Sequence, residues 1–161
     1  MIAIFEKEKV VSICKLFLKG VIMGNRAVIA IEGSKQTQTA IYLHWNGGIE
    51  SVATFLKYCE VLGFRPPDSD SYGWTYLSAV IANFFGNGMS VGIGQLRHQD
   101  TDNGDNGVYY IKGWEIVGRS YKRTMKYTVT DDDLEKLNSV QCKAFQDRFK
   151  DYKEGKELKS Y

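Results

Sequence analysis

Six polar or aromatic side chains of this 161-residue sequence could together bind a ligand: His44, Trp45, Asn46, Asn83, Arg97 and Arg119. An aromatic face can stack on a nucleobase, an asparagine amide can read the edge of a base, and an arginine guanidinium forms paired hydrogen bonds with a phosphate. These residue types stand beside glycine- and asparagine-rich turns, where backbone can approach a ligand closely. The set therefore predicts a site for a small nucleotide-like molecule.

Catalytic signatures are sparse in the sequence. It contains two histidines, His44 and His98, and either could act as a base. No nucleophile elbow and no P-loop accompany them, and Gly92 and Gly94 lack the third glycine and the following helix of a dinucleotide fingerprint. We predict no catalytic residue and no cofactor, and we keep a hydrolase using His44 or His98 as an alternative.

The acidic stretch over residues 100–107 resembles a calcium-binding loop only at first sight. Counted from Asp100, the fifth position is Gly104 and the twelfth is Ile111; counted from Asp102, the third position is Gly104. An EF-hand needs oxygen ligands at the early positions and glutamate at the twelfth. We therefore predict no metal site and a solvated hairpin loop, with a weak calcium site of another geometry left open.

His44, Trp45 and Asn46, the first three of the six candidate site residues, lie where a strand ends and a helix begins. Residues 39–45 are rich in β-branched and aromatic residues, which favour a strand, and Asn46–Gly47 is a strong turn signal. Apolar residues then recur at spacings of three and four, which predicts a helix over residues 49–63. Gly63 and the two prolines that follow end it.

The remaining elements complete a single domain. Residues 26–32 form a hairpin with the strand at 39–45, residues 74–85 form a second helix, and Thr130 caps a C-terminal helix. Further strands are expected over these ranges: 90–96, 108–111, 114–119 and 121–129. We predict an α+β fold with a mixed or mostly antiparallel sheet, two helices in the first half and a helix at the C-terminus.

Composition limits the function classes. The chain is 43% hydrophobic and 25% charged, as is typical of soluble globular proteins, and its formal charge of +2 is too small for a general nucleic-acid binder. Its three cysteines are far apart and fit neither a disulfide framework nor a zinc spacing. We expect free thiols, a location in the cytoplasm of a host cell and no membrane association, and we leave homo-oligomerisation open.

Residues 1–22 differ from the rest of the chain. Their apolar run is interrupted by charged residues, so it matches neither a membrane span nor a signal peptide. Codons for residues 19–23 can spell a ribosome-binding site just before Met23. We hypothesise that residues 1–22 are an upstream extension and that residues 23–161 form the domain. The alternative is a short amphipathic helix packed on the domain. A native chain whose N-terminal sequence begins at Met1 would contradict the hypothesis.

Three short motifs carry a resemblance to a known group of proteins: His-Trp-Asn-Gly-Gly at 44–48, Asn-Phe-Phe-Gly at 83–86 and Gly-Asp-Asn-Gly at 104–107. Together they resemble small uncharacterised proteins of phages and mobile elements in Gram-positive bacteria, over roughly residues 25–119. The resemblance implies a setting in which proteins of this size counter host defences. We predict a non-catalytic counter-defence factor that sequesters a nucleotide-like signal; the alternative is a protein–protein inhibitor of a host defence nuclease or effector.

Overall fold

The computed structural model describes residues 25–86 and 90–159, so the prediction for residues 1–22 lies outside the described part of the chain. A five-stranded sheet forms the centre of the molecule, in the order β3-β2-β1-β4-β5. β1 and β4 run parallel and the other neighbours run antiparallel. The strands span Ala27–Ile31 (β1), Thr39–Leu43 (β2), Val91–Gln95 (β3), Val108–Lys112 (β4) and Glu115–Arg119 (β5). The predicted α+β fold with a mixed sheet is confirmed.

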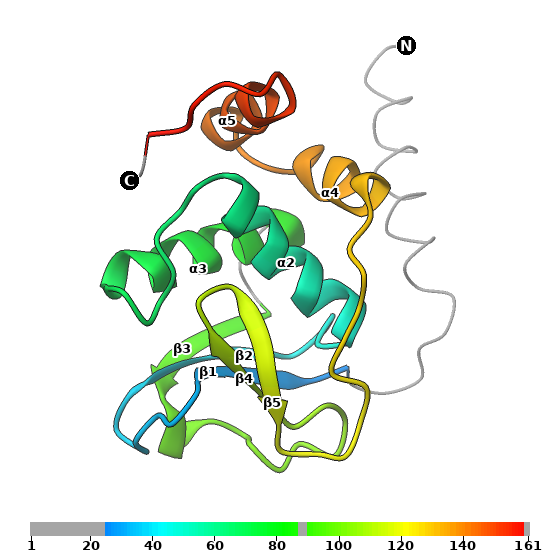
Figure 1. Cartoon of the computed structure of the whole chain (residues 1–161). Helices are drawn as coiled ribbons and strands as arrows, with labels where there is room; N and C mark the ends of the chain where they lie inside the picture. The colour runs from blue at the N-terminus through cyan, green and yellow to red at the C-terminus, as the bar shows by residue number, and fades with distance from the viewer. Residues whose placement is uncertain (1–24, 87–89, 160–161) are drawn as a thin grey trace.

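Helices α2 (Ile49–Val61) and α3 (Ser71–Phe85) cover one face of this sheet, and α4 (Asp131–Asn138) and α5 (Lys143–Lys153) lie beyond α2 (Figure 1). The expected C-terminal helical region is therefore present, but as two helices. The break follows from Gln141, a residue only 5% exposed. Its amide donates to the Val80 carbonyl and accepts from Asn83, which ties this part of the chain to α3.

The strand predicted over residues 121–129 is absent, and the prediction is wrong there. This segment is irregular and runs from the end of β5 to Thr130 at the start of α4 (Figure 1). Arg119 donates to the Thr124 carbonyl at 2.7 Å, so part of the segment is held by a side chain rather than by a strand. Its β-branched and aromatic residues favour a strand locally, but a segment that must leave the sheet for the helical layer cannot pair along it.

The main core lies between the sheet and the helices. Ile29 of β1 and Ile41 of β2 meet Phe55 of α2 and Leu77 of α3, and all four are at most 1% exposed. Tyr58 of α2 stacks on Phe149 of α5 at 5.6 Å, which joins the C-terminal helices to the same core. The apolar residues of α2 therefore pack both in the core between sheet and helices and against the C-terminal helices, which explains why so much of α2 is buried.

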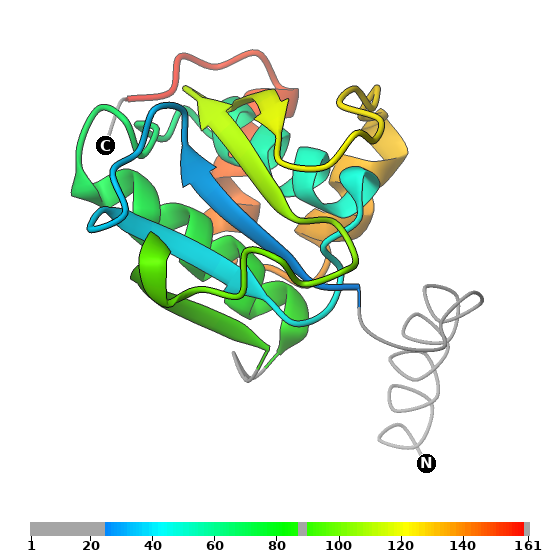
Figure 2. The same ribbon diagram turned by 90° about the horizontal axis from the view of Figure 1, so that it is seen from below.

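The second face of the sheet is covered by the chain itself. Leu96, in the short 3₁₀ helix η1 (Leu96–His98), packs with small and branched residues of the central strands, among them Val28, Ala30 and Val108. Figure 2 shows the chain after η1 crossing this face on its way to β4. Since β3 and β4 are not neighbours in the sheet, the stretch at 100–107 belongs to this crossover and not to the predicted hairpin. No helix among the described residues is long and apolar enough to cross a membrane.

The start of α4 allows a modest stability prediction. Thr130 accepts a hydrogen bond from the Asp133 backbone N–H, and the Asp133 carboxylate accepts one from the Thr130 backbone N–H, which makes a capping box. Replacing Thr130 with alanine should lower the free energy of unfolding by about 1 kcal/mol. The change is measured by urea unfolding. The matched control Thr128→Ala, an exposed threonine two residues earlier, should change it little; equal losses in both variants would contradict the capping account.

Candidate ligand-binding site

The turn between β2 and α2 is held tightly against the start of β1. Asn46 adopts a left-handed conformation with φ of 55°, and the Gly47 N–H donates to the Asn25 carbonyl at 2.6 Å. A Cβ on Gly47 would lie 2.6 Å from the Cβ of Ala27, so only glycine fits this approach. The Tyr109 hydroxyl donates to the Gly47 carbonyl at 2.8 Å from the other side. The backbone of the turn is therefore fixed from two directions.

Beside this turn a pocket of about 600 Å³ opens between α2, the end of α3, the segment before α4, and α4 itself. Its size lies within the range of known small-molecule sites. The described residues that line it combine polar and apolar side chains: Asn25, Asn46, Glu50, Ser51, Thr54, Phe55, Phe84, Tyr127, Asp133, Lys136, Leu137, Ser139 and Val140.

The turn and the first turn of α2 supply the polar side of the pocket. Asn46, Glu50 and Ser51 line it there. α2 begins after Gly48, which has no side chain to cap the helix, and the Glu50 carboxylate lies close to this end: its Oε2 is 3.1 Å from the place that a Cβ on Gly48 would occupy. A carboxylate near a helix N-terminus is stabilised by the helix dipole.

The end of α3 and the end of α4 supply the apolar side. Phe84 packs edge-on against Phe55 with ring centroids 5.3 Å apart, and Leu137 belongs to the main core. Val140, just after α4, is 38% exposed. A flat, partly apolar molecule could cover this wall while its polar edge faces Asn46 and Glu50.

The remaining polar groups of the lining are engaged within the protein. The Tyr127 hydroxyl donates to Asp133 at 3.0 Å, and Asp133 also accepts from Thr130. Burial alone would raise the pKa of Asp133, but the hydrogen bonds from Thr130 and Tyr127 lower it. Lys136 lies 2.6 Å from Asp132, a residue outside the lining. These side chains form part of the pocket wall, but their polar atoms are already bonded to other residues of the protein.

Of the six side chains predicted as a site, only Asn46 lines this pocket. His44 and Trp45 are its exposed neighbours in the chain, with ring centroids 5.0 Å apart. The Nδ1 atom of His44 lies 3.2 Å from the hydroxyl of Tyr42. The His44 ring therefore contacts two aromatic side chains, exposed Trp45 and half-buried Tyr42, and its backbone N–H donates to the Ser90 carbonyl.

Asn83 and Arg97 lie elsewhere. Asn83 donates to Gln141 at 3.1 Å and so joins α3 to the break between α4 and α5. Arg97 is exposed on η1, which covers the face of the sheet opposite the helices. The structure thus does not bring these two side chains together with Asn46.

Arg119, on β5, is engaged with neighbouring residues. Its guanidinium lies over the Tyr109 ring at 4.3 Å and donates to the carbonyls of Thr124 and Asn106. Burial lowers the pKa of Arg119, while the Tyr109 hydroxyl opposes this change. Through Tyr109, which binds Gly47, this arginine supports the turn from behind instead of facing a phosphate.

Sequence reasoning missed Glu50 and Ser51. The sequence pattern predicts only that both belong to the amphipathic helix over residues 49–63. The available signal is that Ser51 and Thr54 place small hydroxyl side chains three residues apart on α2, directly after the turn, where larger side chains would fill the space.

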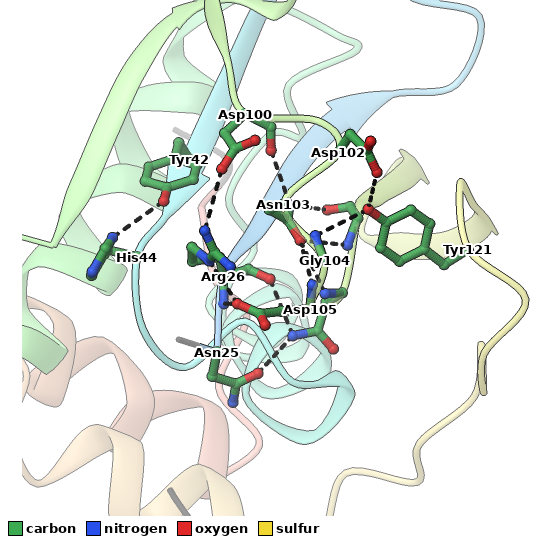
Figure 3. Close-up of polar contacts among 12 residues, drawn as sticks. Asn25, Arg26, Tyr42, His44, Asp100, Asp102, Asn103, Gly104, Asp105 and Tyr121 are labelled. Atoms are coloured by element: carbon green, nitrogen blue, oxygen red, sulfur yellow. Dashed lines mark hydrogen bonds and ion pairs between the residues drawn. The ribbon is translucent and has the colours of Figure 1, made fainter. Parts of the chain in front are cut away.

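The crossover loop beside the turn is a hydrogen-bonded structure centred on Asn103, a residue only 3% exposed (Figure 3). The Asn103 side-chain oxygen accepts from the backbone N–H groups of Asp105, Asn106 and Gly107, and its nitrogen donates to the carbonyls of Asp100 and Gly107. This one amide therefore fixes the path of the loop.

The acidic side chains of the loop have protein partners. Arg26 lies 2.7 Å from Asp105 and 3.6 Å from Asp100, and the Tyr121 hydroxyl donates to Asp102 at 2.6 Å (Figure 3). Within the described ranges, no three His, Cys, Asp or Glu side chains gather in a way that could hold a metal ion.

The pair of Arg26 and Asp105 gives a pH prediction. Burial raises the pKa of Asp105, but the hydrogen bonds from Arg26 lower it below its ordinary value of 3.8. A depressed pKa in the folded state adds stability above the unfolded value, and this stability is lost as the pH falls through the folded value. Asp105→Asn should therefore make the free energy of unfolding less dependent on pH below about 4. Urea unfolding of both proteins at about pH 6 and about pH 3 tests this; an equally steep decrease in the variant would contradict it.

Comparisons with models of known protein families, with characterised proteins and with solved structures found no match.

Proposed function

We propose that this protein is a non-catalytic binding protein that sequesters a small nucleotide-like molecule in the pocket between α2, α3 and α4. The observation that carries the proposal is the two-sided lining of the pocket. Asn46, Glu50 and Ser51 offer polar groups on one side, and Phe84, Leu137 and Val140 form an apolar wall on the other. Small-molecule sites combine an apolar lining with a few polar groups that fix orientation.

The biological role we propose is counter-defence in a mobile-element setting, in the cytoplasm of a host cell. Its support is the resemblance of the three short motifs to phage proteins, together with a site suited to binding. A protein of this kind removes a signalling molecule by mass action, so it needs sufficient affinity and concentration, and no turnover.

A thermal-shift screen of the full chain tests the proposal. The panel contains nucleosides, nucleotides, cyclic nucleotides and ADP-ribose derivatives. A compound present at about a hundred times its dissociation constant adds about 2.7 kcal/mol to the free energy of unfolding, which is readily seen. A shift produced by at least one compound is the expected result. The absence of a shift from every compound would contradict small-molecule sequestration and favour a protein partner.

A second candidate is inhibition of a host defence nuclease or effector through protein–protein contact. The observation that favours it is the edge strand β3. Ile93 at its centre is 57% exposed, and the strand carries neither proline nor a charged residue that would block pairing with another strand. Ile93→Lys should prevent such pairing without changing the pocket. If this variant keeps full counter-defence activity in infected cells, the second candidate is contradicted.

A further inference from the structure

The polar side of the pocket holds a negative charge where a phosphate would otherwise bind well. Free N–H groups at a helix N-terminus attract anions, and α2 starts at a glycine without a capping side chain. The carboxylate of Glu50 lies beside this N-terminus, with Oε2 3.1 Å from the position of a Cβ on Gly48. A phosphate entering here would meet the Glu50 carboxylate at close range.

The other charges of the lining do not compensate for Glu50. Asp133 is a second carboxylate, and Lys136 is the cation among the described lining residues. The Lys136 ammonium is already paired with Asp132 at 2.6 Å. The arginines predicted to hold a phosphate are directed elsewhere: Arg97 is exposed on η1, and Arg119 donates to backbone carbonyls at the far side of Tyr109. The pocket is therefore unfavourable for a phosphate.

The Glu50 carboxylate, the Asn46 amide and the apolar wall of the pocket are well suited to a neutral ligand. A carboxylate accepts hydrogen bonds with both of its oxygens, which matches the paired hydroxyl groups of a ribose. Asn46 can both donate and accept, as the edge of a nucleobase requires. The apolar wall of Leu137 and Val140 offers contact for the face of the base.

We propose that the pocket takes a nucleoside-like molecule, a base with its sugar and without a phosphate, and that Glu50 determines this specificity by accepting hydrogen bonds from the sugar hydroxyls. This inference rests on the proposed function. It narrows the ligand from a nucleotide-like molecule to an uncharged one, and it assigns Glu50 a role in selecting that ligand.

Isothermal titration of the full chain with adenosine, guanosine, cytidine, uridine and their 5′-monophosphates tests the inference. At least one nucleoside should bind, and its monophosphate should bind about tenfold or more weakly, because a like charge at close range opposes it. Glu50→Gln should weaken nucleoside binding by about tenfold and reduce the penalty for the phosphate. Glu60→Gln is the matched control, since Glu60 is, like Glu50, an exposed glutamate of the same helix but lies outside the pocket lining; it should leave both affinities unchanged.

The outcomes separate this inference from the proposed function. If the monophosphates bind as tightly as the nucleosides or more tightly, the inference is overturned and sequestration of a nucleotide stands. If none of the eight compounds binds, the inference is overturned, while the proposed function is decided by the cyclic nucleotides and ADP-ribose derivatives of the thermal-shift panel. Glu50→Asp guards against a folding defect in the first variant: it keeps the charge, so it should keep the preference for the nucleoside. An unchanged ratio of the two affinities in Glu50→Gln would overturn the role of Glu50.

Discussion

Replacing Ser51 with tryptophan should reduce the affinity for the bound ligand by about a hundredfold or more, because a large side chain then occupies space that the ligand needs. Ser51 is a small residue on the first turn of α2 and lines the polar side of the pocket. Its side chain takes part in none of the hydrogen bonds that cap or cross-link the described elements, so its loss removes little else. The affinity is measured by titration calorimetry with the tightest-binding compound of the thermal-shift screen.

The matched control is Lys57→Trp, which introduces the same side chain at an exposed position of the same helix. It should bind the ligand as the wild type does. Thermal unfolding in the absence of ligand shows whether Ser51→Trp remains folded. A folded Ser51→Trp variant with wild-type affinity would place the ligand outside this pocket.

The second large effect is expected in the crossover loop. Asn103→Ala should lower the free energy of unfolding by about 3 kcal/mol, because one buried amide makes five hydrogen bonds with backbone groups, of which those with Gly107 are buried and the others partly buried. A typical hydrogen bond contributes about 1 kcal/mol net, and some of the released backbone groups will find water in the variant. Urea unfolding monitored by circular dichroism measures the loss.

Asp102→Ala is the control for Asn103→Ala. Asp102 is exposed in the same loop and accepts one side-chain hydrogen bond, from Tyr121, so its replacement should cost well under 1 kcal/mol. Similar losses in the two variants would contradict the central role of Asn103. The loop also supports the pocket, because Asn106 donates to the side chain of Asn25, a lining residue, at 2.6 Å.

Local patterns predicted most of the elements correctly. The strong signal of Asn46–Gly47 and the apolar spacing of the following helix reflect interactions within a few residues, and the structure has the turn and α2 where they were expected. The left-handed conformation of Asn46 follows from the same turn chemistry. The capped start at Thr130 was also predicted from neighbouring residues.

Errors arose where distant parts of the chain decide the structure. Residues 121–129 have the composition of a strand, but the connection to α4 takes them away from the sheet. The break between α4 and α5 depends on the contacts of Gln141 with Asn83 and Val80, more than fifty residues earlier in the chain. The sequence of residues 100–107 predicts a hairpin instead of the observed crossover, because strand order is not visible in local sequence.

At the candidate site, too, contacts between distant parts of the chain could not be predicted from local sequence. Asn46 was identified because its turn is recognisable, whereas Glu50 and Ser51 become site residues only when α4 is placed beside α2. Arg119 resembles a phosphate ligand in sequence, but the fold uses it to support Tyr109 and the crossover loop. Residue type alone could not distinguish binding a phosphate from supporting the fold, since both roles need a guanidinium that donates several hydrogen bonds.

Binding of a nucleoside between α2, α3 and α4 can be measured by equilibrium dialysis of the full chain against an equimolar mixture of adenosine, guanosine, cytidine and uridine, followed by mass spectrometry of both compartments. One nucleoside should be enriched with the wild-type protein and recovered chemically unchanged, and Ser51→Trp should show no enrichment. A nucleoside converted to free base would instead indicate a hydrolase. Equal enrichment by wild type and a folded Ser51→Trp variant, or enrichment of no nucleoside, would contradict a nucleoside site between α2, α3 and α4.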